Sequence, residues 1–411
     1  MNEHVLVGFG FGPIQGGLFV SEASKSGCFN RMVIAEIDPK IVEAIRANRG
    51  AYQVNVAGSS GISTECIHGV EIYNPAAEAD RQELLKALTQ ATEIVTSLPS
   101  VSFYDIGEHS VASLIAQGLK NNTAKATILY TAENNNHAAE ILEEKVKEYS
   151  GKLNKTVQFL NTVIGKMSQV VMDKKEIVDK NLNPIAPGID RAFLVEEFNR
   201  ILVTKCTIPE FRPGVQVFLE KEDLLPFEEA KLYGHNAIHA LLAYLGSQKG
   251  YKKMSEIEND AEIMRIAEDA FIHESGKALI QKYEHLNEEL FTPTGYRAYA
   301  EDLLRRMINP WLGDTVERAA RDPQRKLGLN DRLFGTMALC LERGIQPKNL
   351  ALAAAAGIAY YIKQTGRSDD LSCQEILSQL WKNQSSPYRA GLIKHTETAF
   401  ARLPSLTNTG T

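Results

Sequence analysis

The sequence predicts an α/β fold, with a doubly wound, mainly parallel sheet in the first half and a mainly α-helical second half. In the first half, short apolar runs alternate with longer segments of helical spacing. From about residue 215 the β-branched runs disappear and long amphipathic stretches follow. At 411 residues the chain exceeds what one core usually spans. We therefore expect one domain over residues 1–214 and a second over 215–411.

Five apolar runs are expected to form buried strands of the first domain. In chain order they are HVLVGFG (4–10), RMVIAEID (31–38), TEIVTSLP (92–99), KATILYTAEN (125–134) and TVQFLNTVI (156–164). Because helical segments separate them, the strands should be parallel, with helices on both faces of the sheet. In the second domain the clearest helical patterns are LPFEEAKLYGHNAIHALLAYLG (225–246) and DAEIMRIAEDAFIHESGKALIQKYEHL (260–286).

The stretch VLVGFGFGPIQGGLF, residues 5–19, is expected to join the first strand to a helix as a dinucleotide-binding loop of the Rossmann type. Proline suits the first turn of a helix, which favours one register of the fingerprint. The residues in that register are Gly10, Phe11, Gly12, Pro13, Ile14 and Gln15. Gln15 replaces the usual third glycine, and Gly16 and Gly17 are expected to restore part of the close packing that it gives up. A purely structural glycine turn is the alternative.

Glu36 and Asp38 end the second predicted strand and indicate NAD as the cofactor. An acidic side chain at this place can accept hydrogen bonds from the ribose hydroxyls and repel the 2′-phosphate of NADP. The alternative is a solvated strand end followed by a turn. Ser97 and Leu98, at the end of the third predicted strand, complete the candidate cofactor residues.

The helical stretch 225–246 carries polar residues inside an apolar pattern. At 100° per residue, Lys231, His235, Asn236 and His239 share one broad face, with Glu228 one turn earlier. A partly dry pocket can lower the pKa of a lysine toward the range that suits a general base. The alternative is a solvated stripe with a weak Glu228–Lys231 ion pair.

Two further polar segments are candidates for ligand contacts. ENNNHAAE (133–140) follows a predicted strand at the carboxyl edge of the sheet, where open α/β sheets bind ligands, although its asparagines could instead cap the next helix. VERAARDPQRKLGLNDRL (316–333) is rich in cations, among them Arg325. These could bind a phosphate or a carboxylate, while helix-surface ion pairs are the alternative.

Composition and motifs argue against several other functions. The net charge of −6, without a long basic run, makes nucleic-acid and membrane partners unexpected. The five cysteines are scattered without a CxxC pair, and HExxH and GxSxG are absent, so we expect no metal site and no serine nucleophile. The start of the sequence resembles no signal peptide and no apolar run would span a bilayer, so a cytoplasmic protein is expected.

Several motifs, in this order, resemble the polyol-specific long-chain dehydrogenases, and most closely their mannitol-1-phosphate 5-dehydrogenase branch. They are FGFGPIQGGLF (9–19), NRGAYQVNVAG (48–58), AEN (132–134), KLYGHNAIHALLAYLG (231–246), HESGKALIQKY (273–283) and INPWLGDTVERAARDPQRKLGLNDRL (308–333). The resemblance covers most of the chain. It implies a metal-independent, NAD-dependent secondary-alcohol dehydrogenase that interconverts a polyol or polyol phosphate and the corresponding ketose or ketose phosphate, acting as a monomer or homodimer.

The resemblance also implies roles for individual residues. In the Lys-x4-Asn-x2-His motif, Lys231 would be the general base, Asn236 together with Asn134 would hold the oxyanion, and His239 would orient the substrate. His235 and Lys166 are candidate substrate contacts. Gly165-Lys166 replaces the Asp-Arg pair of many relatives, so two alternatives stay open: a sugar-acid oxidoreductase and a catalytically silent NAD-binding protein.

Overall fold

Strand β1 (His4–Phe9) lies inside an eight-stranded sheet in the order β12-β11-β8-β7-β6-β1-β2-β5. The structure is a computed structural model that describes residues 4–366, 372–382 and 384–403. All five predicted strands are confirmed, as β1, β2 (Phe29–Ala35), β6 (Glu93–Thr96), β7 (Thr127–Thr131) and β8 (Val157–Ile164). They pair in parallel, and the strand order reverses at β1. Open α/β sheets place ligands at such a reversal, outside the carboxyl ends of the strands.

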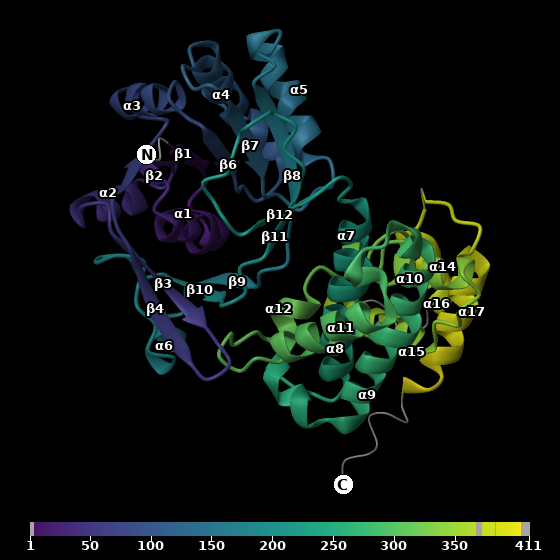
Figure 1. The fold of residues 1–411 in the computed structure, drawn as a ribbon. Coiled ribbons are helices and arrows are strands. Elements are labelled where there is room, and N and C mark those ends of the chain that lie inside the picture. Colours follow the sequence, from purple (N-terminus) through teal and green to yellow (C-terminus); the bar gives the residue numbers. More distant parts are fainter. Residues whose placement is uncertain (1–3, 367–371, 383, 404–411) are drawn as a thin grey trace. The chain divides into compact units, whose positions relative to one another are not determined.

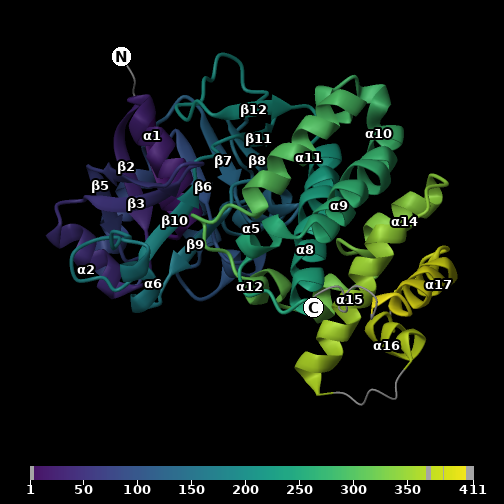
Figure 2. The same ribbon diagram turned by 90° about the horizontal axis from the view of Figure 1, so that it is seen from below.

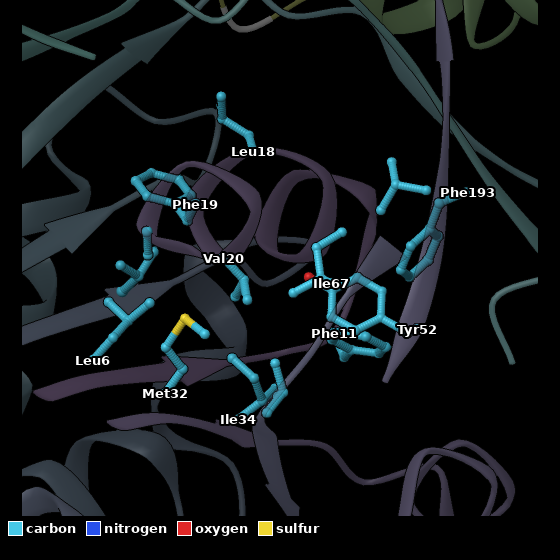
Figure 3. Close-up of a cluster of buried hydrophobic side chains, with 14 of the residues drawn as sticks. Leu6, Phe11, Leu18, Phe19, Val20, Met32, Ile34, Tyr52, Ile67 and Phe193 are labelled. Carbon is cyan, nitrogen blue, oxygen red and sulfur yellow. The ribbon is translucent and has the colours of Figure 1, made fainter. Parts of the chain in front are cut away.

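Helices cover both faces of this sheet (Figure 1). They are the π-helix η1 (Gln15–Val20) with its continuation α1 (Ser21–Ser26), α2 (Pro39–Ala47), α3 (Glu78–Leu88), the 3₁₀ helix η2 (Val101–Asp105), α4 (Val111–Lys120) and α5 (Ala138–Ser150). Alternate residues of β1 enter different cores. Leu6 belongs to the same buried cluster as Leu18 and Ile34 (Figure 3), whereas Val5 and Val7 enter the core on the other face. The strand is therefore apolar throughout, as expected for burial on both faces.

A second sheet, in the order β4-β3-β10-β9, was not predicted from the sequence. Its strands are β3 (Tyr52–Ala57), β4 (Ile62–Ile67), β9 (Ser168–Val171) and β10 (Ala192–Glu196), with helix α6 (Lys174–Asp179) between the last two. Three short strands of the larger sheet were missed as well: β5 (Val70–Tyr73), β11 (Ile201–Thr204) and β12 (Phe218–Lys221). β11 runs antiparallel to β8, so the large sheet is mixed at this end.

The chain divides into two compact units, Met1–Leu225 and Pro226–Thr411. The predicted boundary at 214/215 precedes β12, which pairs with β11 of the first unit. The domain limits 1–214 and 215–411 stay a prediction.

The second unit is mainly helical in its described residues, as expected from its amphipathic patterns, with one isolated β-bridge between Lys253 and Thr315. Its helices are α7 (Leu225–Glu229, which begins at the last residue of the first unit), η3 (Ala230–Asn236), α8 (Ala237–Gln248), η4 (Met254–Asn259), α9 (Ala261–Asp269), η5 (Ala270–Gly276), α10 (Lys277–Tyr283), η6 (Glu284–Leu286), η7 (Glu289–Phe291), α11 (Pro293–Met307), α12 (Val316–Ala320), α13 (Pro323–Lys326), α14 (Phe334–Glu342), α15 (Lys348–Thr365), α16 (Cys373–Leu380) and α17 (Arg389–Phe400).

The alanine-rich helix α15 packs against α8 and α17 in the core of the second unit (Figure 2). A Cβ atom on Gly357 would lie 3.0 Å from the ring of Tyr244 on α8, so glycine keeps the two helices close. Within the described residues, no helix is long and apolar enough to cross a membrane.

Candidate active site

The loop after β1 has the geometry of a dinucleotide-binding turn. Gly10 has φ of +84°, and a Cβ atom there would lie 2.7 Å from the carbonyl oxygen of Ser97, so only glycine fits. The helix begins at Pro13, as predicted. A Cβ atom on Gly12, in contrast, would meet no atom within 4 Å. The protein's own packing does not require Gly12, which is expected where backbone is kept bare for a ligand.

Gln15 fits at the third fingerprint position because the neighbouring strand supplies the glycine. Its side chain is fully buried, and a Cβ atom on Gly8 of β1 would lie 2.2 Å from its Nε2 atom. Neither Nε2 nor Oε1 of Gln15 has a hydrogen-bond partner within the described part of the chain. The small residue that allows helix and strand to approach has therefore moved from the helix to the strand.

Gly16 and Gly17 do not restore this packing, contrary to the expectation from the sequence. Instead, they face the second sheet, where added Cβ atoms would lie 3.0 Å from the ring of Phe193 and 2.7 Å from Val195. Both of these side chains belong to β10. The two glycines therefore let η1 lie close against the second sheet, an element that the sequence analysis did not anticipate.

The two acidic residues after β2 have different surroundings. Glu36 accepts hydrogen bonds from the backbone N–H groups of Phe11 (2.9 Å) and Asp38 (2.8 Å), which places its carboxylate beside the glycine loop. Asp38 caps α2 through the N–H of Lys40 and forms an ion pair with Arg191 at 2.5 Å. The Arg191 guanidinium lowers the pKa of Asp38. Asp38 thus belongs to the turn before α2, which was the alternative to ribose binding. The carboxylate of Glu36 lies where it could bind a ribose.

Ser97 and Leu98 lie at the carboxyl end of β6, directly against Gly10. The N–H of Ser97 donates to the carbonyl of Phe9 (3.0 Å), and that of Leu98 donates to Oε1 of Glu133 (2.8 Å). The sequence analysis quoted Glu133 only as part of a motif. A carboxylate at the end of an otherwise apolar strand was the available signal.

Asn134 follows Glu133 and is exposed at the carboxyl edge of the sheet. Asn135, rather than Asn134, accepts the N–H of His137 just before α5. The N-cap of α5 is His137 and, among the described residues, no side chain caps this helix, so the capping alternative is wrong for these asparagines. The oxyanion role of Asn134 stays a prediction.

Lys166, in the turn after β8, is buried and bound within the first unit. Its Nζ donates to the carbonyl oxygens of Glu196 and Phe198 and to the side chain of Asn199. Burial lowers its pKa to about 8. These bonds use all three donors of the ammonium group, so in this structure Lys166 has a structural role. Its predicted role as a substrate contact would require one of these bonds to open.

In the second unit, the segment that carries the Lys-x4-Asn-x2-His motif is continuous but not α-helical throughout. The stretch Ala230–Asn236 forms the π-helix η3 between α7 and α8. The prediction of a uniform 100° per residue is therefore wrong here, because a π turn holds more residues than an α turn. π segments inside α-helices are frequent at functional sites.

Two hydroxyl groups stabilise the wide turn of η3. The carbonyl oxygen of Tyr233 accepts hydrogen bonds from Ser275 (2.8 Å) and Thr336 (3.3 Å). Ser275 belongs to a second π segment, η5, which packs against η3. A Cβ atom on Gly234 would lie 2.7 Å from the hydroxyl of Tyr296, so this turn needs glycine to fit against α11.

Lys231, inside η3, has the pKa shift that a general base needs. Burial lowers its pKa, Glu228 opposes the shift and the positive charge of Arg332 adds to it, which together bring the pKa to about 8. An appreciable fraction of the amine is then neutral near physiological pH, so Lys231 can accept a proton.

His235 and His239, which follow Lys231 in the same helical segment, differ in environment. His235 is buried, and burial together with the neighbouring His239 holds its pKa well below the usual range, so it is neutral. The Nε2 atom of His239 lies 3.0 Å from Oδ2 of Asp314, whose Oδ1 accepts a 2.7 Å hydrogen bond from Arg318.

Asp314 orients His239 and was missed by the sequence analysis, although the motif WLGDT contains it. Burial would raise the pKa of Asp314, but the hydrogen bonds and charges of His239 and Arg318 outweigh it and hold the pKa well below the usual range. An ionised carboxylate in this position fixes the ring of the histidine, because it gives one ring nitrogen a strong partner.

The cations of the segment 316–333 separate into an exposed and a buried group. The side chain of Arg325, the predicted substrate contact, is 59% exposed, and its guanidinium pairs with Asp322 at 2.7 Å. Lys326 is buried, and burial together with the charge of Arg332 lowers its pKa to about 7. Since Arg332 also lowers the pKa of Lys231, Arg332 is better placed than Arg325 to act beside the base.

Within the described residues, no group of three or more histidine, cysteine or acidic side chains gathers as a metal site would require.

Comparisons with known proteins show what the chain is similar to. Residues 223–397 match the family model of the mannitol dehydrogenase C-terminal domain. The mannitol-1-phosphate 5-dehydrogenase of Exiguobacterium sibiricum is 29% identical over 359 residues, which cover 86% of this chain and 85% of that protein. The enzyme of the same name from Buchnera aphidicola is 29% identical over 376 residues, covering 89% and 88%.

Two solved structures share the fold at low sequence identity. A substrate-free D-sorbitol dehydrogenase superposes with a TM-score of 0.75 at 14% identity, covering 98% of this chain and 94% of that one. The mannitol 2-dehydrogenase of Pseudomonas fluorescens, in a ternary complex with NAD and D-mannitol, gives a TM-score of 0.69 at 15% identity, covering 99% and 93%.

Proposed function

Since this chain carries the mannitol dehydrogenase C-terminal domain and belongs with the polyol-specific long-chain dehydrogenases, we propose that it is an NAD-dependent secondary-alcohol dehydrogenase for a polyol or polyol phosphate. The observation that carries the proposal is Lys231. It lies in a π segment of the matched domain, with its pKa lowered to about 8. A solvated stripe, the alternative from the sequence, would not lower the pKa of a lysine in this way.

The residues of the first unit fit NAD. The bare backbone at Gly12 and the helix that begins at Pro13 would receive the pyrophosphate, and Glu36 would accept the ribose hydroxyls. When bound, NAD supplies the acceptor for the hydride that leaves the carbinol carbon. A carboxylate at Glu36 disfavours the 2′-phosphate of NADP by charge repulsion.

Lys231 would take the proton of the substrate hydroxyl as the C–H bond of the same carbon gives up its hydride. The alcohol becomes a ketone, and the neutral amine of Lys231 becomes an ammonium group. In the opposite direction this ammonium returns the proton to the developing alkoxide. Asn236, with Asn134 as the second donor, would hold the oxyanion, a contribution for which one lost donor typically costs about 3 kcal/mol.

His239 would orient the substrate by hydrogen bonds to its hydroxyl groups. Asp314 and Arg318 fix the ring in place from behind. His235, which is neutral and buried, can act as donor or acceptor toward a further hydroxyl. Since Lys231 supplies the base, the proposal assigns no step to a metal ion.

A phosphorylated substrate is the finer part of the proposal. The positive charge of Arg332 lowers the pKa of both Lys231 and Lys326, so its guanidinium lies near both amines. Mutual repulsion of this kind is relieved when an anion binds between the charges. A phosphate, or the carboxylate of a sugar acid, would provide that anion. The names of the curated relatives favour phosphate.

The test follows NADH formation with hexitols, pentitols, their phosphates and sugar acids, with NAD and with NADP. Turnover of a polyol or its phosphate with NAD, abolished in Lys231→Ala, is the expected result. Lys326→Met should raise KM for phosphorylated substrates at least tenfold, while the matched control Arg325→Met should not. Turnover of sugar acids alone would favour the second candidate. No turnover despite NAD binding would indicate a silent protein and refute the proposal.

A further inference from the structure

Glu133 is a buried carboxylate at the carboxyl edge of the large sheet that the proposed chemistry does not use. Its side chain follows β7, and the residue is 5% exposed. Three donors from one neighbouring stretch of chain converge on it. Its Oε1 accepts the backbone N–H of Leu98 at 2.8 Å, and its Oε2 accepts the hydroxyls of Thr96 (2.9 Å) and Tyr104 (2.5 Å).

These three donors belong to the segment that leaves β6 and contacts the glycine loop. Thr96 ends the strand, Leu98 lies two residues later, and Tyr104 is fully buried in η2. The same segment limits the space at Gly10, where an added Cβ would lie 2.7 Å from the carbonyl oxygen of Ser97 and 3.2 Å from the side chain of Leu98. The position of this segment therefore sets the shape of the loop edge that faces a dinucleotide.

Glu133 also anchors its own turn. Its carbonyl oxygen accepts the N–H of Asn135 at 2.8 Å, so Asn134 is held between a buried carboxylate and a closed turn. Burial raises the pKa of Glu133, whereas the hydrogen bonds from Tyr104, Leu98 and Thr96 oppose that rise. In either protonation state Oε1 can accept the N–H of Leu98, so acceptor geometry rather than charge is the property that matters.

We propose that Glu133 is a positioning residue for the cofactor: its carboxylate holds the segment 96–104 against the Gly10 turn in the shape that binds NAD. The inference rests on the proposed function, because it assumes NAD as the ligand. It assigns Glu133 no contact with the reacting atoms. The residue acts through Leu98 and the neighbouring Ser97.

The same sheet offers a matched control at its opposite edge. Glu93, at the amino end of β6, is also fully buried and accepts a backbone N–H, that of Gly214, at 2.7 Å. Replacing either glutamate by leucine leaves a buried N–H without its acceptor, which costs stability in both cases. Only the loss at Glu133 should alter the binding of NAD.

The experiment titrates NAD into the full-length protein by calorimetry, with thermal unfolding measured in parallel. We expect Glu133→Leu to raise the Kd for NAD about tenfold, which corresponds to the net contribution of one hydrogen bond. Glu133→Gln keeps an acceptor for Leu98 and should stay within about threefold of the wild type. Glu93→Leu should lower the melting temperature but leave the Kd within about twofold, because its lost hydrogen bond lies away from the loop.

Either of two results would overturn the inference: a folded Glu133→Leu with unchanged Kd, or an equal rise in Kd for Glu93→Leu. If Glu133→Leu does not fold, Tyr104→Phe serves instead, because it removes one donor and leaves the carboxylate. A Kd at least threefold higher supports the inference, and an unchanged Kd refutes it. A wild-type protein that binds no NAD would refute the proposed function itself.

Discussion

The pH dependence of alcohol oxidation tests the role of Lys231 most directly. With a pKa of about 8, about a tenth of Lys231 is neutral at pH 7 and about 1% at pH 6. An unshifted lysine, with a pKa near 10.5, would be neutral to about 0.03% at pH 7. The burial of Lys231 therefore increases the supply of neutral base about 300-fold at this pH.

We expect kcat/KM for the polyol to rise about tenfold from pH 6 to pH 7 and to level off above about pH 9, because only the neutral amine accepts the proton. The rate of ketose reduction needs the ammonium form, so it should stay nearly constant from pH 6 to pH 7 and fall steeply above about pH 8. Initial rates of NADH formation at saturating NAD measure the first profile, and Lys231→Ala is the control. A profile that is flat between pH 6 and pH 8, or one that still rises at pH 10, would contradict the assignment.

Three further predictions concern the surroundings of the site. Asp314→Asn should raise KM for the polyol about tenfold and leave the Kd for NAD unchanged, because His239 loses its charged partner. Steady-state kinetics measure KM and calorimetry measures the Kd; an equal rise in both constants would contradict this prediction. Gly12→Ala should keep the melting temperature and weaken NAD binding, since its Cβ meets no protein atom; a loss of stability with intact binding would argue for the structural-turn alternative. Gly234→Ala should lower the free energy of unfolding by about 1–3 kcal/mol and lower kcat, because the added Cβ would clash with Tyr296 within the π turn. Chemical denaturation measures the loss of stability, and a variant as stable as the wild type would refute the clash.

The large sheet was predictable because its central strands are buried on both faces. Such strands read as continuous apolar runs, and β1, β6 and β7 all do. The second sheet gave a weaker signal. β4 is largely exposed and β9 has only four residues, so neither stands out against the turns around it. Pairing with distant strands, rather than local pattern, makes these segments extended.

The candidate site was predictable in its residue types but not in its geometry. Lys231, Asn236 and His239 were found from their spacing and from the resemblance. The π turn that carries the first two was not, because a helical wheel assumes one residue spacing along the whole helix. Glu133 and Asp314 were missed for a related reason. Each acts through a hydrogen bond to a residue far away in the chain, which spacing cannot reveal.

The π segment also makes the length of this helix a functional property. A π turn is equivalent to an α-helix that has gained one residue, so it turns whatever precedes it by about 100° relative to whatever follows. Removing Leu232 from the π-helix Ala230–Asn236 would let the helix close as a regular α-helix. The direction of Lys231 relative to His239 would then change by about 100°, although every side chain named in the mechanism would still be present. The number of residues in the segment Ala230–Asn236 is therefore as important for this site as the identity of its side chains.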